Sequence, residues 1–333
     1  RGHRTRISLV ALVGLAALIL AGCARQEAPA SGEVPEARTV TLAMGFIPNV
    51  QFTPLYVAVE RGYFAEEGIE VTFDYGMEHD LLKLGGTNEL QVVIGSGDQV
   101  ILARGQDLPV VYVLNWYRRC PVSVAALGPL ADPQDLVGMD VGIPGLYGAS
   151  YIGWLALLDA AGIEPTSVNL LSIGYTQVES LVTEQVDAAV VYAMNEPVQL
   201  RQEGYTVSEI EVADYIDFVS NGLITNEQTI RDDPDLVRSV ARAMSRGLQD
   251  TLDDPDAAFA ICRQHVPEID DESAPLQRAV LQEALDFWRP ADGQALGHSN
   301  PAAWQASAAF MQQTGMVEGE VDVESLYSND FVQ

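Results

Sequence analysis

Basic residues are scarce in this chain, and lysine is nearly absent. The 333 residues include 18 lysines and arginines against 47 aspartates and glutamates, a formal net charge of −29, and Lys83 is the only lysine. A surface this negative argues against binding to nucleic acid or to anionic lipid, because both carry charge of the same sign. It argues less strongly against an anionic small ligand, since one local site can differ from the overall field. Solubility or an unusual habitat also explains the acidic excess.

Motifs for metal binding and for nucleophilic catalysis are missing as well. The chain has three cysteines and four histidines, and they form no H-E-x-x-H, paired CxxC or EF-hand pattern. No G-x-S-x-G nucleophile elbow occurs either. We therefore expect no metal, no bound cofactor and no catalytic residue.

Cys120 and Cys262 are the cysteines outside the amino-terminal segment. In an exported protein two cysteines can form a disulfide. These two fall in segments that we expect to lie far apart, so free buried thiols fit the sequence equally well. Both options stay open.

The amino terminus has the pattern of an export signal. Three arginines within the first six residues precede an apolar run over residues 7–20, which is too short to span a membrane comfortably. The next residues, Ala21, Gly22 and Cys23, complete a pattern that resembles a bacterial lipobox. The resemblance implies that residues 1–22 are a signal peptide and that Cys23 carries a lipid on the extracytoplasmic face of the cell membrane. An ordinary signal cut elsewhere is the alternative. Residues 23–38 are rich in Pro, Ala, Glu and Ser and indicate a flexible tether.

The most informative stretch follows this tether. Residues 39–44 alternate apolar and polar and predict a strand, residues 52–64 have helical spacing, and residues 69–75 predict a second strand. The loop after the first strand carries Asn49, Gln51 and Phe52. Loops at the carboxyl ends of strands are where open α/β sheets bind ligands, so these three residues are candidate ligand contacts.

This stretch resembles the opening of solute-binding proteins of ABC importers, which share a fold with the thiamine-pyrimidine synthases and the alkanesulfonate binders. The residues that carry the resemblance are Ala58, Gly62, Tyr63, Phe64, Glu67, Gly68, Ile69 and Val71. The resemblance implies an α/β fold of the type II periplasmic-binding-protein kind. Each of its two lobes would hold a mixed sheet flanked by helices, with the ligand in the cleft between them. It also implies two partners, an ABC permease and its ATPase, and we expect a monomer.

The chain is expected to cross between the lobes twice, within residues 116–121 and 215–219. Lobe I then comprises residues 39–118 and 219–333, and lobe II comprises residues 119–218. Trp116 and Tyr117 end the strand before the first crossing. They either pack in the core or stack on a flat ligand at the edge of the cleft, and Asn221 is a late contributor to the same cleft.

Further candidates lie where predicted strands meet helices. Ser96 and Asp98 either cap a helix or bind ligand through that helix start. Tyr147, Gly148 and Ser150 belong to a glycine-rich turn that lacks the P-loop lysine, and the resemblance implies that this turn lines the cleft. Tyr175 follows the next predicted strand.

Tyr192, Asn195 and Glu196 flank the end of an apolar strand. Amide and carboxylate groups offer donors and acceptors together, which suits the edge of a heterocycle. The resemblance implies that pyrimidine-binding members place a Tyr and a Glu near this strand end. The alternative is that Asn195 and Glu196 cap the next helix.

The candidate residues favour a neutral, flat heterocycle, because they are aromatic or mixed polar. The stretch over residues 45–52 is most similar to riboflavin-binding members of the resembled group, so we rank riboflavin first and a thiamine-precursor pyrimidine second. An alkanesulfonate ranks third, and it requires Arg118 and Arg119 to face the cleft. A pyrimidine-synthase-like enzyme is the rival from another class, but the chain lacks the cysteine-rich motif of the fungal synthases. A sensor module that binds the same ligand is a further alternative.

Overall fold

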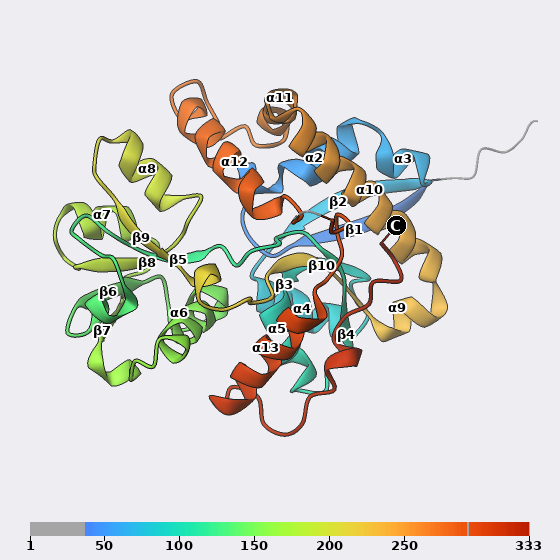
Figure 1. Ribbon diagram of the computed structural model, residues 1–333. Coiled ribbons are helices and arrows are strands. Elements are labelled where there is room, and N and C mark those ends of the chain that lie inside the picture. The colour runs from blue at the N-terminus through green and yellow to red at the C-terminus, as the bar shows by residue number, and fades with distance from the viewer. Residues whose placement is uncertain (1–36, 292, 333) are drawn as a thin grey trace, which may run out of the picture. The chain divides into compact units, whose positions relative to one another are not determined.

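The computed structural model describes residues 37–291 and 293–332, which fold into two five-stranded sheets with helices packed around each (Figure 1). The predicted signal peptide, Cys23 and nearly all of the tether lie outside the described residues. Among the described residues, no helix combines the length and the apolar character needed to cross a membrane.

The first sheet has the strand order β2-β1-β3-β10-β4. Its strands are β1 (Arg38–Met44), β2 (Ile69–Tyr75), β3 (Val92–Ser96), β4 (Val110–Asn115) and β10 (Asn221–Asn226). β1 pairs in parallel with β2 and β3, whereas β10 pairs antiparallel with β3 and β4. The sheet is mixed, and β10 joins it only after the chain has built the second sheet.

Helices from both ends of the chain cover this first sheet. The early elements are η1 (Val50–Phe52), α2 (Thr53–Glu60), α3 (Tyr63–Glu66), α4 (Glu78–Gly86) and α5 (Gly97–Arg104). The late elements are α9 (Glu227–Asp232), α10 (Pro234–Asp253), α11 (Pro255–His265), α12 (Ala274–Trp288), α13 (Pro301–Gln313) and η5 (Val323–Ser325).

The second sheet has the order β7-β6-β8-β5-β9. Its strands are β5 (Val122–Ala126), β6 (Asp140–Ile143), β7 (Asn169–Ser172), β8 (Ala188–Tyr192) and β9 (Ser208–Glu211). Its helices are η2 (Pro133–Leu136), α6 (Gly148–Ala160), η3 (Pro165–Ser167), α7 (Gln177–Val182), α8 (Glu196–Gln202) and η4 (Val212–Asp214). β6 pairs in parallel with β7 and β8, while β5 pairs antiparallel with β8 and β9. The expected two-lobed α/β fold with one mixed sheet in each lobe is confirmed.

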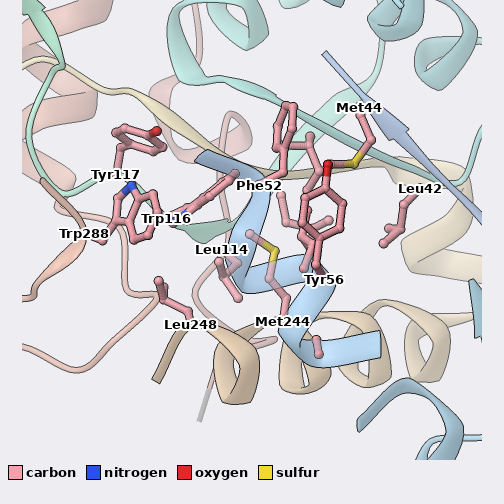
Figure 2. Close-up of a cluster of buried hydrophobic side chains, with 14 of the residues drawn as sticks. Leu42, Met44, Phe52, Tyr56, Leu114, Trp116, Tyr117, Met244, Leu248 and Trp288 are labelled. Carbon is pink, nitrogen blue, oxygen red and sulfur yellow. The ribbon is translucent and has the colours of Figure 1, made fainter. Parts of the chain in front are cut away.

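Close packing of α2 against α10 anchors the core of the first lobe. Asp233 accepts a hydrogen bond from the Leu236 backbone N–H, which caps the start of α10. Gly247 sits where α10 meets α2, and a Cβ there would lie 2.2 Å from the Pro54 carbonyl oxygen. Only glycine allows this approach. Figure 2 shows Met244 and Leu248 of α10 in the buried cluster beside α2.

The chain passes between the sheets twice. Residues 116–121 connect β4 to β5, and residues 212–220 connect β9 to β10. The exact lobe boundaries, after residues 118 and 218, remain predictions.

The segment after the first loop is less regular than predicted. The single helix predicted over residues 52–64 is wrong: it is divided into η1, α2 and α3, and Gly62 separates the two α-helices with φ +76°. That left-handed backbone suits glycine and ends the hydrogen-bonding pattern of α2.

Cys120 and Cys262 are both buried and free, so the disulfide option does not hold.

Candidate ligand-binding site

A cavity of about 990 Å³ lies between the two sheets. The loops that follow β1, β2 and β4 contribute to one wall, together with residues of β3 and α5, and the loops that follow β6, β7 and β8 contribute to the other. β1, β3, β6 and β8 take part in parallel pairing, so the cavity opens at the carboxyl ends where α/β sheets place ligands. Its volume is at the upper end for small-molecule sites.

All but two of the predicted contacts line this cavity. The lining includes Asn49, Gln51, Phe52, Trp116, Tyr117, Tyr147, Gly148, Ser150, Tyr175, Tyr192, Asn195, Glu196 and Asn221. Ser96 and Asp98 do not line it, because both are buried behind the wall, at 0% and 2% exposure. Their role as direct ligand contacts is therefore wrong as predicted.

On the side of the first sheet, the wall is a layer of aromatic rings that pack in the core (Figure 2). The ring of Trp116 lies 6.1 Å from Phe52, 5.2 Å from Tyr117 and 5.5 Å from Trp288, measured between centroids. Trp116 and Tyr117 are 2% and 4% exposed. The rings pack in the core and their remaining surface faces the cavity. Stacking on a flat ligand stays a prediction.

The wall on the second sheet is more open. Tyr147 and Tyr175 are 55% and 63% exposed, and they come from the loops after β6 and β7. Gly148 begins α6 with φ +68°, a conformation that favours glycine and lets Tyr147 leave the helix axis. Tyr175 also lies 6.0 Å from Phe46, which belongs to the loop after β1. The two walls thus touch at their aromatic rims.

A polar bond also joins the walls. Gln51 Nε2 donates to Asn195 Oδ1 at 2.6 Å, from the loop after β1 to the loop after β8. Asn49 holds this loop in place, because its Oδ1 accepts from the Gln51 backbone N–H at 2.8 Å and caps η1. Asn195 precedes α8 but makes no side-chain cap there. The predicted alternative, that Asn195 is only a cap, is wrong.

Glu196 opens α8 with its carboxyl group turned back toward β8. Its Oε2 accepts from the Tyr192 backbone N–H at 3.0 Å. Burial raises the pKa of Glu196 above its ordinary value, and two backbone hydrogen bonds oppose the shift. The carboxyl group is thus held at the cavity wall with little access to water.

Neither arginine considered for anion binding reaches the cavity. Arg118 Nε donates to the Arg289 carbonyl oxygen at 2.9 Å and borders a separate small cavity of about 80 Å³. Arg119 pairs with Glu211 at 2.7 Å and with Asp214 at 3.0 Å. Among the described residues that line the large cavity, none is an arginine or a lysine. The arrangement required for an alkanesulfonate is therefore not found.

Sequence reasoning missed Glu78, a half-buried acid on the wall formed by the first sheet. Glu78 opens α4, lines the cavity, and accepts hydrogen bonds on Oε1 from the Ser96 backbone N–H and from Ser96 Oγ, the latter at 2.7 Å. Nothing around Glu78 in the sequence marks it, since a glutamate in the first turn of a helix is ordinary. Ser96 was predicted as a ligand contact. It instead donates a hydrogen bond to Glu78 and supports the cavity wall from behind.

Comparison with known proteins places this architecture in a family. A family model described as NMT1/THI5 like matches residues 49–258, a span that runs from the Asn49 loop through both sheets into α11. The chain belongs to the NMT1/THI5-like family. This membership agrees with the resemblance carried by residues 58–71.

Two relatives similar in sequence to this NMT1/THI5-like chain are named as binding proteins. The riboflavin-binding protein RibY of Chloroflexus aurantiacus is 42% identical over 312 residues, covering 92% of this chain and 89% of the relative. The formylaminopyrimidine-binding protein of Halalkalibacterium halodurans is 29% identical, covering 95% of this chain and 96% of the relative. Among solved structures, the periplasmic aliphatic sulphonate binding protein SsuA of Escherichia coli aligns with a TM-score of 0.69 at 14% identity, covering 87% of this chain and 91% of that one. That last likeness shows the fold alone.

Proposed function

We propose that this chain is an extracytoplasmic solute-binding protein of an ABC importer and that its ligand is riboflavin. One observation supports the ligand class above all: aromatic side chains line the cavity from both sheets, and within residues 37–291 and 293–332 no arginine or lysine lines it. Aromatic faces offer a large contact area with few torsions to freeze. A neutral, flat ring system suits such walls, whereas an anion would find no arginine or lysine to balance its charge among the described residues that line the cavity.

The relatives support the same order of candidates. The relative named for riboflavin is 42% identical, and the one named for formylaminopyrimidine is 29% identical. A thiamine-precursor pyrimidine is therefore the second candidate. A pyrimidine is a single ring, and it would leave more of the 990 Å³ cavity unfilled than riboflavin would.

Hinge closure is the mechanism that we propose for capture. A ligand that touches Trp116 on one wall and Tyr175 on the other stabilises the closed form, because only that form contacts it from both sides. The Gln51–Asn195 hydrogen bond would contribute to the same closed form. The loaded protein would then deliver riboflavin to a permease and its ATPase, held at the membrane by a lipid on Cys23.

Binding rather than catalysis is part of the proposal. A 4-amino-5-hydroxymethyl-2-methylpyrimidine phosphate synthase of Legionella pneumophila is also a relative, but it is only 24% identical. The two more similar relatives are named for binding. Self-modification of a histidine, or turnover of a pyrimidine product, would favour the enzyme instead.

An absorbance scan of protein purified without refolding, followed by a thermal-shift panel, tests the proposal. Riboflavin, a hydroxymethylpyrimidine and an alkanesulfonate are added separately at equal concentration. We expect flavin absorbance in the preparation or the largest rise of the melting temperature with riboflavin. A colourless protein stabilised by the pyrimidine alone would replace riboflavin with the second candidate, and stabilisation by the sulfonate alone would overturn the ligand class.

A further inference from the structure

The Glu78 side chain occupies a space that two glycines leave free. A Cβ at Gly95 of β3 would lie 2.8 Å from Glu78 Oε1, and a Cβ at Gly45, just after β1, would lie 3.2 Å from Glu78 Cβ. A larger residue at Gly95 would meet the carboxyl group itself, whereas one at Gly45 would first meet the Ile94 carbonyl oxygen, 2.7 Å from its Cβ. The ends of two neighbouring strands are thus shaped to admit this one carboxyl group to the cavity wall.

The two carboxyl oxygens of Glu78 have different surroundings. Oε1 accepts from both the backbone N–H and the hydroxyl of Ser96. Within residues 37–291 and 293–332, Oε2 has no hydrogen-bond partner from the protein. A proton on this carboxyl group therefore belongs on Oε2, because both acceptor positions of Oε1 are taken.

Asp98 is the second acid of this region, and it lies behind the wall. The Ser96 hydroxyl is close to the carboxyl groups of both Glu78 and Asp98. Asp98 is buried and Glu78 is half-buried, so a charge on one of the two carboxyl groups disfavours a charge on the other. Burial and the charge of Asp98 raise the pKa of Glu78 to about 7, and burial raises the pKa of Asp98 as well.

The negative charge is better supported on Asp98 than on Glu78. Each acid lies in the first turn of a helix, Glu78 in α4 and Asp98 in α5, so the helix dipole does not distinguish them. The Asp98 carboxylate has more donors, because the backbone N–H groups of Asp98 and Gln99 add to the side-chain donors, whereas among the described residues Glu78 accepts from Ser96 alone. Asp98 Oδ2 accepts from Gln99 Nε2 at 2.9 Å. The proton of the pair is therefore better placed on Glu78.

The other titratable groups near the pair are neutral or turn away from it. Burial, with the charges of Glu78 and Asp98, raises the pKa of Tyr192 on β8, so this phenol stays protonated. Burial also raises the pKa of Cys120 to about 12 and that of the Tyr112 phenol. His79 follows Glu78 but pairs with Asp80, 3.2 Å from Nε2 to Oδ1, and Lys83 also lies beside Asp80. In the described part of the chain, no cation contributes to either acid.

We propose that Glu78 and Asp98 share one proton at neutral pH, and that Glu78 Oε2–H donates a hydrogen bond to an acceptor atom of the bound ring. Glu78 is then a specificity-determining residue: it recognises a ring carbonyl or ring nitrogen and disfavours ligands that present only donors at that point. This inference rests on the proposed function for the identity of the ring, but the shared proton exists without any ligand.

The shared proton is tested on the ligand-free protein by infrared difference spectroscopy across a pH titration. We expect a carbonyl stretching band of a protonated carboxyl group that disappears as pH rises above about 7. The band should be absent in Glu78→Gln. In Asp98→Asn it should persist but disappear at lower pH, because the neighbouring charge is gone. A wild-type spectrum without a band that titrates near neutral pH overturns the shared proton, and so does a band that Glu78→Gln retains.

The donor role is tested by the pH dependence of riboflavin affinity. Only the protonated form donates, so the wild-type Kd should rise up to about tenfold for each pH unit above the pKa, between about pH 7 and pH 9. Glu78→Gln should lose this slope, because its amide donates at every pH. Any slope that remains in this variant reports titration of the ligand itself and can be subtracted from the wild-type slope. A wild-type Kd that stays constant or falls as pH rises would overturn the donor role. If riboflavin fails to bind at any pH, the proposed ligand is wrong, and the infrared titration still decides on the shared proton.

Discussion

The aromatic residues of the two cavity walls differ in burial: Trp116 and Tyr117, on the side of the first sheet, are buried in the core, whereas Tyr147 and Tyr175, on the side of the second sheet, stand on exposed loops. Trp116 is 2% exposed, and Tyr175 is 63% exposed. Since buried rings are already held by their neighbours, the first wall is preformed. The second wall has surface still to bury, so ligand binding gains most of its new contact there. One wall sets the shape of the ligand, and the other closes over it.

The largest expected effect comes from breaking the preformed wall. Trp116→Ala removes a buried ring packed on Phe52, Tyr117 and Trp288, and it should lower the free energy of unfolding by about 3–5 kcal/mol. Riboflavin binding should be lost with it. Urea unfolding and fluorescence titration measure the two effects. Trp116→Phe keeps an aromatic face, so it should retain part of both; unchanged stability in Trp116→Ala would contradict a preformed wall.

The half-buried Glu78 of the first wall should make stability depend on pH. The pKa of Glu78 is raised to about 7 in the folded protein, so its protonated form stabilises the fold at low pH. This contribution, at most about 3 kcal/mol, is present below the pKa of about 4.5 expected in the unfolded chain and is lost as pH rises through about 7. The melting temperature should therefore fall over this range.

Glu78→Gln provides the matched comparison, because it removes the titrating group and keeps the size of the side chain. Its melting temperature should fall less over the same pH range than that of the wild type. The raised pKa values of Glu196, Glu209 and Glu211 leave a smaller slope in both proteins. Parallel curves for the two proteins would show that Glu78 carries no such shift.

The exposed wall should separate affinity from stability. Tyr147→Ala and Tyr175→Ala each remove an exposed ring, so each should weaken riboflavin binding by about 0.5–1.5 kcal/mol and change the free energy of unfolding by less than about 0.5 kcal/mol. Tyr205→Ala is the control, since Tyr205 is 38% exposed but does not line the cavity. A stability loss as large as that of Trp116→Ala would erase the difference between the walls.

An effect similar in size to that of one exposed tyrosine is expected at the bond that joins the walls. Gln51→Ala removes the 2.6 Å hydrogen bond to Asn195, and the Kd for riboflavin should rise about fivefold, equivalent to about 1 kcal/mol. Gln199→Ala is the control, because it removes an exposed side-chain bond to Glu203 away from the cavity. Equal effects in the two variants would mean that the bond between the walls has no special role.

Local pattern was sufficient to predict much of the fold. The alternation of apolar and polar residues predicts a strand over residues 39–44, which lies within β1. It also predicts residues 69–75 as a strand, and these are the bounds of β2. The break at Gly62 was missed, because the apolar stripe continues across it and only the left-handed backbone interrupts the helix.

The site was predictable where a residue stands at the carboxyl end of a strand, as Asn49 and Tyr175 do. It was not predictable where the role depends on distant segments. Asn195 bonds to Gln51, 144 positions away in the sequence, and Glu78 reaches the cavity only because Gly45 and Gly95 leave room for it. Arg119 is directed away by acids on and after β9. None of these pairings leaves a trace in the local sequence.

The most direct test of the account is a fluorescence titration of riboflavin with the purified protein. Flavin emission should be quenched at micromolar protein and saturate at one riboflavin per chain, because the ring would lie against Trp116, Tyr117 and the tyrosines of the opposite wall. If the protein is folded and flavin emission still stays bright at every protein concentration, riboflavin is not the ligand of this cavity.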